Sequence, residues 1–209
     1  MSIFEDGLSK NQANFASLSP LSFLERTRKT FPNHNAVEYK DYTLTYQEAG
    51  SRCDALANLL INKNITSGNT VAVMLPNIPV MWECHFGIPM ALGVMNAINT
   101  RLDSNTVKFI LDHGEAKLFI YDSEYSEIIQ KALEDVSNPP VLIEYVDKVA
   151  GNKRSDFADL KHCLDYETEI NKFIGKEYKD DIELVTIIRS SLADTCADSS
   201  FEVVKRWFK

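Results

Sequence analysis

The pattern of apolar and polar residues is clearest between Thr70 and Asn99. Thr70–Leu75 is a short apolar run rich in β-branched residues, which is typical of a strand buried on both faces. A largely buried helix is expected over Val80–Leu92, and a second buried strand over Val94–Ile98. A strand, a crossover helix and a second strand make up the unit from which parallel sheets are built. This stretch therefore predicts an α/β core.

The residues before Thr70 predict two helices and a hairpin. A helix is expected over Leu21–Lys29 after Ser19 and Pro20, and two β-prone runs, Ala36–Tyr39 and Tyr42–Tyr46, suggest a hairpin. The next helix carries a single apolar stripe that we expect to pack on a sheet, made of Cys53, Leu56, Ala57, Leu60 and Ile61.

The alternation of helices and strands continues beyond Asn99. A helix is expected to place Val107, Ile110 and Leu111 on one face and to end at Gly114. The elements expected after it are a strand at Lys117–Tyr121, a helix at Glu124–Glu134 and a strand at Val141–Tyr145. The predicted fold class is α/β, with a doubly wound, mostly parallel sheet that has helices on both faces and follows a helix and a β-hairpin.

Residues that favour helix starts support these boundaries. A capping side chain accepts a hydrogen bond from a free N–H group of the first turn, and proline is tolerated there. The proposed caps are Asn77 before Pro79, Thr45 with Glu48 in a capping box, and Asp103 or Ser104.

Composition favours one main domain. The 209 residues, 44% of them hydrophobic, suffice for one sizeable core. We expect residues 1–18 to form a flexible N-terminal arm, residues 19–147 an α/β subdomain, and residues 148–209 a divergent or truncated tail.

Charge and apolar run length exclude several classes of protein. The net charge of −8, with no basic run longer than Lys153–Arg154, argues against nucleic-acid partners and against docking on anionic membranes. The uncharged run Phe86–Ile98 is too short to span a bilayer, so no membrane span is expected. Four cysteines without metal-ligand spacing, and no signal peptide at Met1, predict a cytoplasmic protein with reduced thiols.

Five segments in order resemble the N-terminal segment of AMP-forming acyl-CoA synthetases, within the adenylate-forming superfamily. They are LSPLSFLER (18–26), FPNHNAV (31–37), VAVMLPN (71–77), NAINTRLD (96–103) and ILDHGEAK (110–117). The nearest resemblance is to medium-chain fatty-acid ligases and plant-type acyl-activating enzymes. It covers about residues 14–121 and fades after Tyr166. The family implies ATP, Mg²⁺ and CoA as cofactors and cosubstrates, and a fatty acid or related carboxylic acid that becomes an acyl-adenylate and then a CoA thioester.

The resemblance does not supply an active site. The family holds the ATP phosphates with a Ser/Thr/Gly-rich loop ending in Pro-Lys-Gly, because glycines let backbone N–H groups approach the phosphates. Here Glu183–Ile188 is a candidate for the preceding strand, but Ser190–Ser200 has no glycine, proline or lysine. The interpretations are a reading-frame change or a premature stop that replaces that loop, and a genuine C-terminus with a helix over Phe201–Phe208. No catalytic, cofactor-binding or metal-ligating residue is assigned.

Several isolated polar residues are candidates for functional sites. His85, two residues from Glu83, is expected to be a core or boundary histidine and not half of an acid–base pair. His113 is expected to stabilise a helix end, and Arg101 to be solvated. Tyr121-Asp122 is a candidate for lining a ligand crevice, because open α/β sheets bind ligands at strand carboxyl ends.

Three functions stay open from the sequence. The first is the N-terminal part of an AMP-dependent acyl-CoA synthetase that is inactive by itself. The second is a non-catalytic fragment that binds a partner or an intact ligase. The third is a small α/β domain with weak nucleotide binding. The oligomeric state and the acid activated by a parent enzyme are not predicted.

Overall fold

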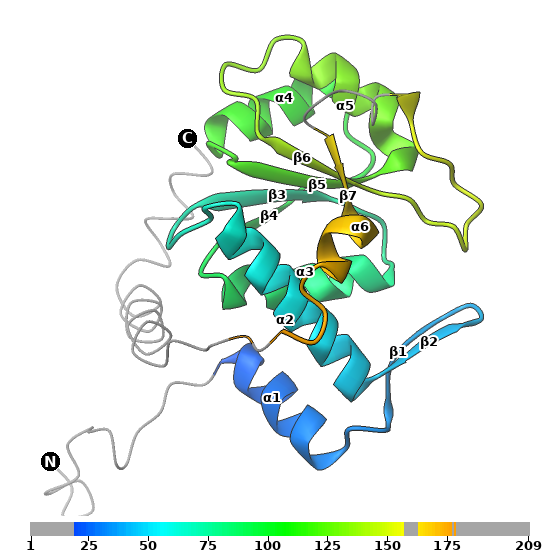
Figure 1. Cartoon of the computed structure of the whole chain (residues 1–209). Coiled ribbons are helices and arrows are strands. Elements are labelled where there is room, and N and C mark those ends of the chain that lie inside the picture. The colour runs from blue at the N-terminus through cyan, green and yellow to red at the C-terminus, as the bar shows by residue number, and fades with distance from the viewer. Residues whose placement is uncertain (1–18, 157–162, 177, 179–209) are drawn as a thin grey trace, which may run out of the picture.

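The computed structural model describes residues 19–156, 163–176 and 178 of the chain. Within this part, a five-stranded sheet forms the centre of the fold (Figure 1). Every neighbouring pair of its strands is parallel. Across the sheet the strands follow the order β4 (Val94–Ala97), β3 (Thr70–Met74), β5 (Leu118–Asp122), β6 (Val141–Tyr145) and β7 (Cys163–Asp165).

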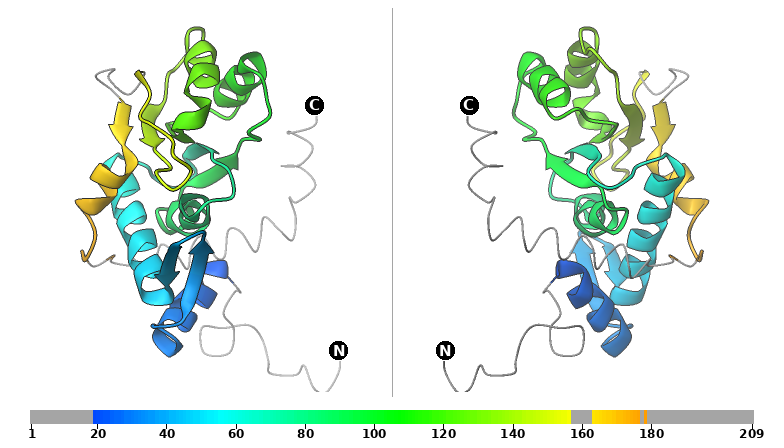
Figure 2. Two further views of the ribbon diagram at one scale, coloured as in Figure 1. Left: turned by 90° about the vertical axis from the view of Figure 1, so that its right-hand side faces the viewer. Right: turned by 90° about the vertical axis from the view of Figure 1, so that its left-hand side faces the viewer.

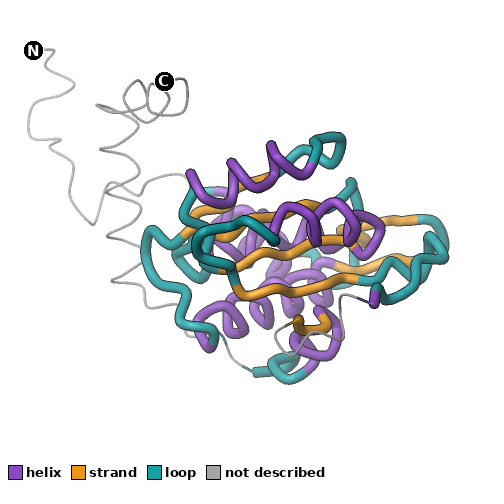
Figure 3. Tube along the Cα trace, turned by 90° about the horizontal axis from the view of Figure 1, so that it is seen from above, coloured by secondary structure: helices purple, strands orange, loops and turns teal. Residues whose placement is uncertain are grey.

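Helices cover both faces of this sheet, as Figure 3 shows from above. One core lies beneath α2 (Tyr46–Asn62), α3 (Pro79–Met90) and α6 (Tyr166–Asn171). The other lies beneath α4 (Ser104–His113) and α5 (Ser126–Leu133), which follows a short 3₁₀ turn, η1 (Ser123–Tyr125). Neighbouring residues of β3 alternate between the two cores, as the side-chain period of two requires. The predicted doubly wound fold is confirmed.

The helix and hairpin that precede the sheet are also present. Helix α1 (Pro20–Thr30) packs against α2, and the antiparallel pair β1 (Asn35–Tyr39) and β2 (Tyr42–Thr45) lies beside it at the same end of the molecule (Figure 2). The hairpin leads directly into α2 through Thr45, whose capping box with Glu48 is formed as predicted. The start of α2 therefore fixes where the hairpin lies.

Two local predictions about burial are wrong. Strand β4 was expected to be buried, but it lies at the edge of the sheet beside β3 alone, and Val94 is 50% exposed. Ile61, expected on the buried stripe of α2, is 49% exposed because it lies at the edge of that stripe. The other stripe residues, from Cys53 to Leu60, are fully buried.

The caps agree with the sequence at two helices and differ at a third. Asp103 accepts a hydrogen bond from the backbone N–H of Thr106 at 2.9 Å, and Gly114 follows the last residue of α4. At α3 the residue before the first turn is Ile78 and not Asn77, and no side chain caps the helix. Pro79 occupies the first helical position, where its missing N–H costs little.

Strand β7 and helix α6 were not predicted. They lie within the stretch 148–209 that the sequence suggested as a tail, and β7 pairs with β6 in the sheet. The proposed arm 1–18, the candidate strand Glu183–Ile188 and the segments after it lie outside the described residues. None of the helices in the described part is both long enough and apolar enough to cross a membrane.

Candidate functional site

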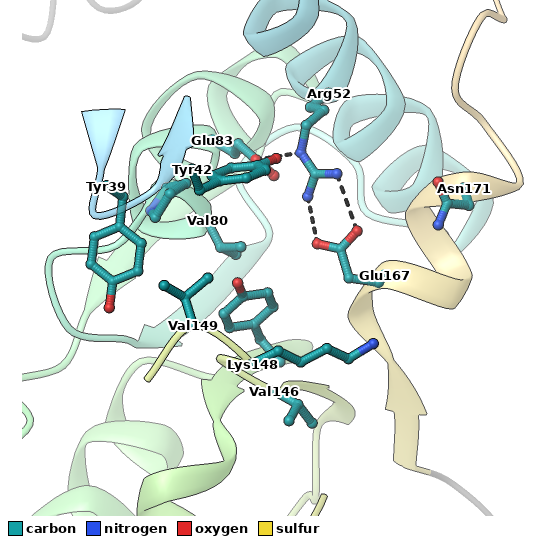
Figure 4. Close-up of a pocket in the computed structure, with 12 residues that line it drawn as sticks. Tyr39, Tyr42, Arg52, Val80, Glu83, Val146, Lys148, Val149, Glu167 and Asn171 are labelled. Carbon is teal, nitrogen blue, oxygen red and sulfur yellow. Dashed lines mark hydrogen bonds and ion pairs between the residues drawn. The ribbon is translucent and has the colours of Figure 1, made fainter. Parts of the chain in front are cut away.

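A cavity of about 350 Å³ lies between the hairpin, α2, α3, α6 and the segment that follows β6 (Figure 4). These elements meet at the carboxyl end of β6, which is the end of a parallel sheet where ligands bind. The polar and aromatic side chains on its wall include Tyr39, Tyr42, Arg52, Glu83, Lys148 and Glu167.

Arg52 is the centre of the polar network at this cavity. It comes from α2, and its Nε donates to Oε1 of Glu83 on α3 at 2.5 Å. Its two terminal nitrogens donate to the two carboxylate oxygens of Glu167 on α6, at 2.6 and 3.1 Å. One guanidinium therefore connects three helices, and it uses its planar fork in the bidentate geometry that suits a carboxylate.

Glu83 is the buried member of this network. Its second oxygen, Oε2, accepts a hydrogen bond from the Tyr166 hydroxyl at 2.7 Å. Burial raises the pKa of Glu83, while Arg52 and the Tyr166 hydroxyl act in the opposite direction. Burial next to the Glu83 carboxylate also raises the pKa of Tyr166 well above its usual value, so Tyr166 stays a hydrogen-bond donor.

A second polar contact lies on the hairpin side of the cavity. The Tyr39 hydroxyl donates to Oδ2 of Asp147 at 2.7 Å, and this hydrogen bond raises the pKa of Tyr39 to about 12. The other oxygen of Asp147 accepts the backbone N–H groups of Val149 and Ala150, at 2.9 and 3.0 Å. Asp147 thus fixes the segment after β6 and attaches the hairpin to it.

The structure does not give Tyr121 and Asp122 the predicted role. Both side chains are buried at the end of β5 and face structural partners: the Tyr121 hydroxyl is 3.2 Å from the sulfur of Cys163, and Asp122 accepts from the Glu124 N–H and the Asn152 amide. Neither lines the cavity of Figure 4. The prediction that they line a ligand crevice is wrong, because both side chains are fully buried.

The histidines and Arg101 carry no catalytic geometry. His85, predicted to be a core or boundary histidine, is exposed and therefore not in the core, and its Nδ1 is 2.7 Å from the Met81 carbonyl oxygen. It forms no acid–base pair with Glu83, as predicted, because Glu83 faces Arg52. Arg101 is exposed, as predicted. His113 is in the last turn of α4, as predicted, and stacks on Phe109 with ring centres 5.4 Å apart.

Thiols and acidic groups do not form a metal centre in the described residues. Cys53, Cys84 and Cys163 are buried free thiols, and burial raises the pKa of each of them. No group of three or more histidine, cysteine or acidic side chains in this part of the chain is arranged to hold a metal ion.

Sequence reasoning missed the Arg52 network, although part of its signal was present. Glu83 is the only charged residue between Thr70 and Asn99, and Arg52 directly precedes the first residue of the apolar stripe of α2. A single charged residue in an otherwise apolar stretch, such as Glu83, indicates a buried charge that needs a partner. The partner on α6 had no such signal, because Glu167 lies in a polar stretch.

Comparison with known proteins identifies the family. Residues 24–180 match the family described as AMP-binding enzyme. The chain is 34% identical to an acetate–CoA ligase of Humulus lupulus over 169 residues, which is 78% of this chain and 30% of that protein. It is 43% identical to a peroxisomal trans-cinnamate:CoA ligase of Petunia hybrida, over 62% of this chain and 23% of that one. The chain thus spans about 30% or less of the length of these relatives.

Solved structures show the same fold. The anthranilate CoA ligase AuaEII in complex with anthranoyl-AMP superposes with a TM-score of 0.66 at 16% identity, covering 82% of this chain and 31% of that one. Coronafacic acid ligase from Pectobacterium brasiliense gives a TM-score of 0.65 at 13% identity, covering 77% and 31% of the two chains. These similarities show the fold, and the match over residues 24–180 shows that the chain belongs to the AMP-binding enzyme family.

Proposed function

We propose that this chain is the N-terminal part of an AMP-forming acid–CoA ligase, which activates a fatty or related carboxylic acid with ATP and transfers it to CoA. The observation that carries the proposal is the family match over residues 24–180, together with relatives that are named as ligases of acetate, butyrate, benzoate and cinnamate. Their differing acids give no preference for one substrate, so we propose the carboxylate class alone.

The described residues do not fit Mg²⁺-ATP, which the family implies. A phosphate cradle needs successive backbone N–H groups around glycines, whereas the glycines with positive φ here, Gly68, Gly151 and Gly175, are far apart in the chain. The described part also has no acidic cluster for a metal ion. We therefore derive no reaction step from these residues, and we expect them to supply the scaffold on one side of a longer enzyme.

The test has two parts. Purified 209-residue chain should give no ATP–pyrophosphate exchange above background with acetate, butyrate, benzoate or cinnamate, and exchange with any of them would overturn the proposed lack of adenylation. The transcript should then be sequenced from the Tyr166 codon onward and translated in all three frames. A frame that encodes a Ser/Thr/Gly-rich loop ending in Pro-Lys-Gly would support a ligase, and its absence from every frame would contradict one.

We propose that the protein acts in fatty-acid metabolism and is located in the cytoplasm. Several relatives are named as peroxisomal proteins, including the cinnamate ligase of Petunia hybrida, so the location needs a direct test. A fluorescent protein fused to Met1 leaves the other end of the chain unchanged. Diffuse fluorescence would support the cytoplasmic proposal, and colocalisation with a peroxisomal marker would overturn it.

A further inference from the structure

We propose that the segment after β6, residues 146–155, is a strap that opens as one unit and releases the β1–β2 hairpin when it does so. The strap contributes one wall of the cavity in Figure 4, so its opening changes that wall. The proposal concerns a motion of this chain and does not depend on the proposed ligase function. It rests on the way the strap is held, on a buried carboxylate next to it and on its attachment to the hairpin.

Polar side chains, and not apolar ones, hold the strap on the body of the protein. The Asn152 amide donates to Oδ1 of Asp122 at the end of β5, at 2.9 Å. The Ser155 hydroxyl donates to Oε1 of Glu144 on β6. Val149, in contrast, is 42% exposed and contributes to neither of the two hydrophobic cores. A segment with few buried apolar contacts opens at a lower free energy than the core does.

The carboxylate of Asp122 opposes the closed position of the strap. Asp122 is fully buried, and its Oδ1 accepts from the Glu124 N–H as well as from Asn152. Within the described residues, its Oδ2 has no hydrogen-bond partner, and neither has the buried Oγ of Ser123. Burial, and to a smaller extent the like charges of Asp147 and Glu124, raises the pKa of Asp122. Hydration of this carboxylate on opening therefore offsets part of the energy of the contacts that are lost.

The tip of the hairpin is attached to the strap by two contacts. The Tyr39 hydroxyl donates to Oδ2 of Asp147 at 2.7 Å, and Nζ of Lys40 donates to the carbonyl oxygen of Val149 at 3.2 Å. Oδ1 of Asp147 accepts the N–H groups of Val149 and Ala150, so one carboxylate orders the strap and holds the hairpin. The hairpin is a separate two-stranded sheet, and such a sheet is marginally stable without further contacts. We therefore expect the strap and the hairpin to open together.

Amide hydrogen exchange of the full chain at pH 7, followed by mass spectrometry, measures both openings in one experiment. The strap and the hairpin should show similar protection factors, which should be at least about a hundredfold lower than those of β5, because local opening requires less free energy than global unfolding. Strap amides that are protected as strongly as those of β5 would overturn the proposal.

Two variants test whether the strap and the hairpin are coupled. Asn152→Ala removes the contact with Asp122, which lies on β5 and not in the hairpin. Exchange should nevertheless rise about tenfold or more in both the strap and the hairpin, since a hydrogen bond to a charged group is lost. Tyr39→Phe removes the contact on the hairpin side and should raise exchange in the same two segments. In either variant, no rise, or a rise confined to one segment, would overturn the joint opening.

Asp122→Asn separates this device from a merely structural hydrogen bond. It keeps the size of the side chain but removes the buried charge, so exchange in the strap and the hairpin should fall about threefold or more. If Asp122 served only as an acceptor, the weaker neutral hydrogen bonds would raise exchange instead. Such a rise, or no change, would contradict the proposal.

Lys153→Gln is the matched control, because it changes an exposed strap residue outside the contacts named above. Exchange in both segments should stay as it is in the unchanged protein. A rise as large as that in Asn152→Ala would show that these contacts do not set the opening, and the proposal would then be wrong.

Discussion

Replacing Arg52 and Glu83, singly and together, tests whether the buried ion pair is coupled as the structure requires. Arg52→Met leaves the Glu83 carboxylate buried with the Tyr166 hydroxyl as its remaining partner. Glu83→Leu leaves both Nε of Arg52 and the Tyr166 hydroxyl without their acceptor. Each single change should lower the free energy of unfolding by about 3–5 kcal/mol, because each leaves a buried group uncompensated.

The double variant should lose much less than the sum of the two singles. Met and Leu fill a similar volume without charge, and Glu167 can be hydrated because its side chain is partly exposed. We expect a coupling energy of about 3 kcal/mol or more between the two positions. Urea unfolding followed by far-ultraviolet circular dichroism gives the change in free energy of unfolding for each of the three variants, provided that each transition is cooperative.

An exposed ion pair supplies the matched control. Lys29 Nζ is 2.8 Å from Glu25, but these side chains are 73% and 42% exposed. Lys29→Ala should therefore change the free energy of unfolding by less than about 0.5 kcal/mol. If the losses at Arg52 and Glu83 add to within about 0.5 kcal/mol, the two groups do not act as a pair and the reasoning is refuted.

Three further predictions concern packing, pH and thiol reactivity. Gly87→Ala should lower the free energy of unfolding by about 1–3 kcal/mol, because the added Cβ would lie 2.7 Å from the side chain of Leu56. This loss is expected although alanine favours helices more than glycine does. An unchanged midpoint in urea unfolding would contradict the close contact. Hydrogen bonds from backbone N–H groups lower the pKa of the Asp103 carboxyl in the folded protein. Its contribution to the free energy of unfolding is therefore fully present above the unfolded pKa of about 4, and it is lost as pH falls through the lower folded pKa. In Asp103→Asn the melting temperature should no longer show the part of its pH dependence that comes from this carboxyl. If the plots of melting temperature against pH are parallel for the variant and the unchanged protein, Asp103 does not make this contribution. Ellman's reagent should react only after unfolding with the three buried thiols, Cys53, Cys84 and Cys163.

The sequence was sufficient for the elements with strong local patterns. The β-branched run that begins at Thr70 became the buried strand β3, and Thr45 with Glu48 formed the predicted capping box. In both cases the information lies within a few residues, so no knowledge of distant partners was needed. Strand β7, by contrast, has only three residues and too little pattern to predict, and its pairing with β6 defines it.

The errors about burial have a different cause. Val94 and Ile61 are apolar and lie in suitable periods, but their exposure depends on which elements lie next to them. The polar network needed even more distant information, since Arg52 and Glu167 are 115 positions apart in the chain. A residue pattern can show that Glu83 is unusual, but only the fold shows what it binds.

We propose that this chain is part of an AMP-forming acid–CoA ligase. To test this, the longest protein that the sequenced transcript encodes is expressed, and AMP release is measured with ATP, CoA and each of acetate, butyrate, benzoate and cinnamate. The 209-residue chain at equal concentration serves as the negative control. We expect the longer protein alone to release AMP in an acid-dependent manner and to form the matching CoA thioester. A longer protein that contains the phosphate-binding loop and folds, but forms no AMP with any carboxylic acid, would contradict it.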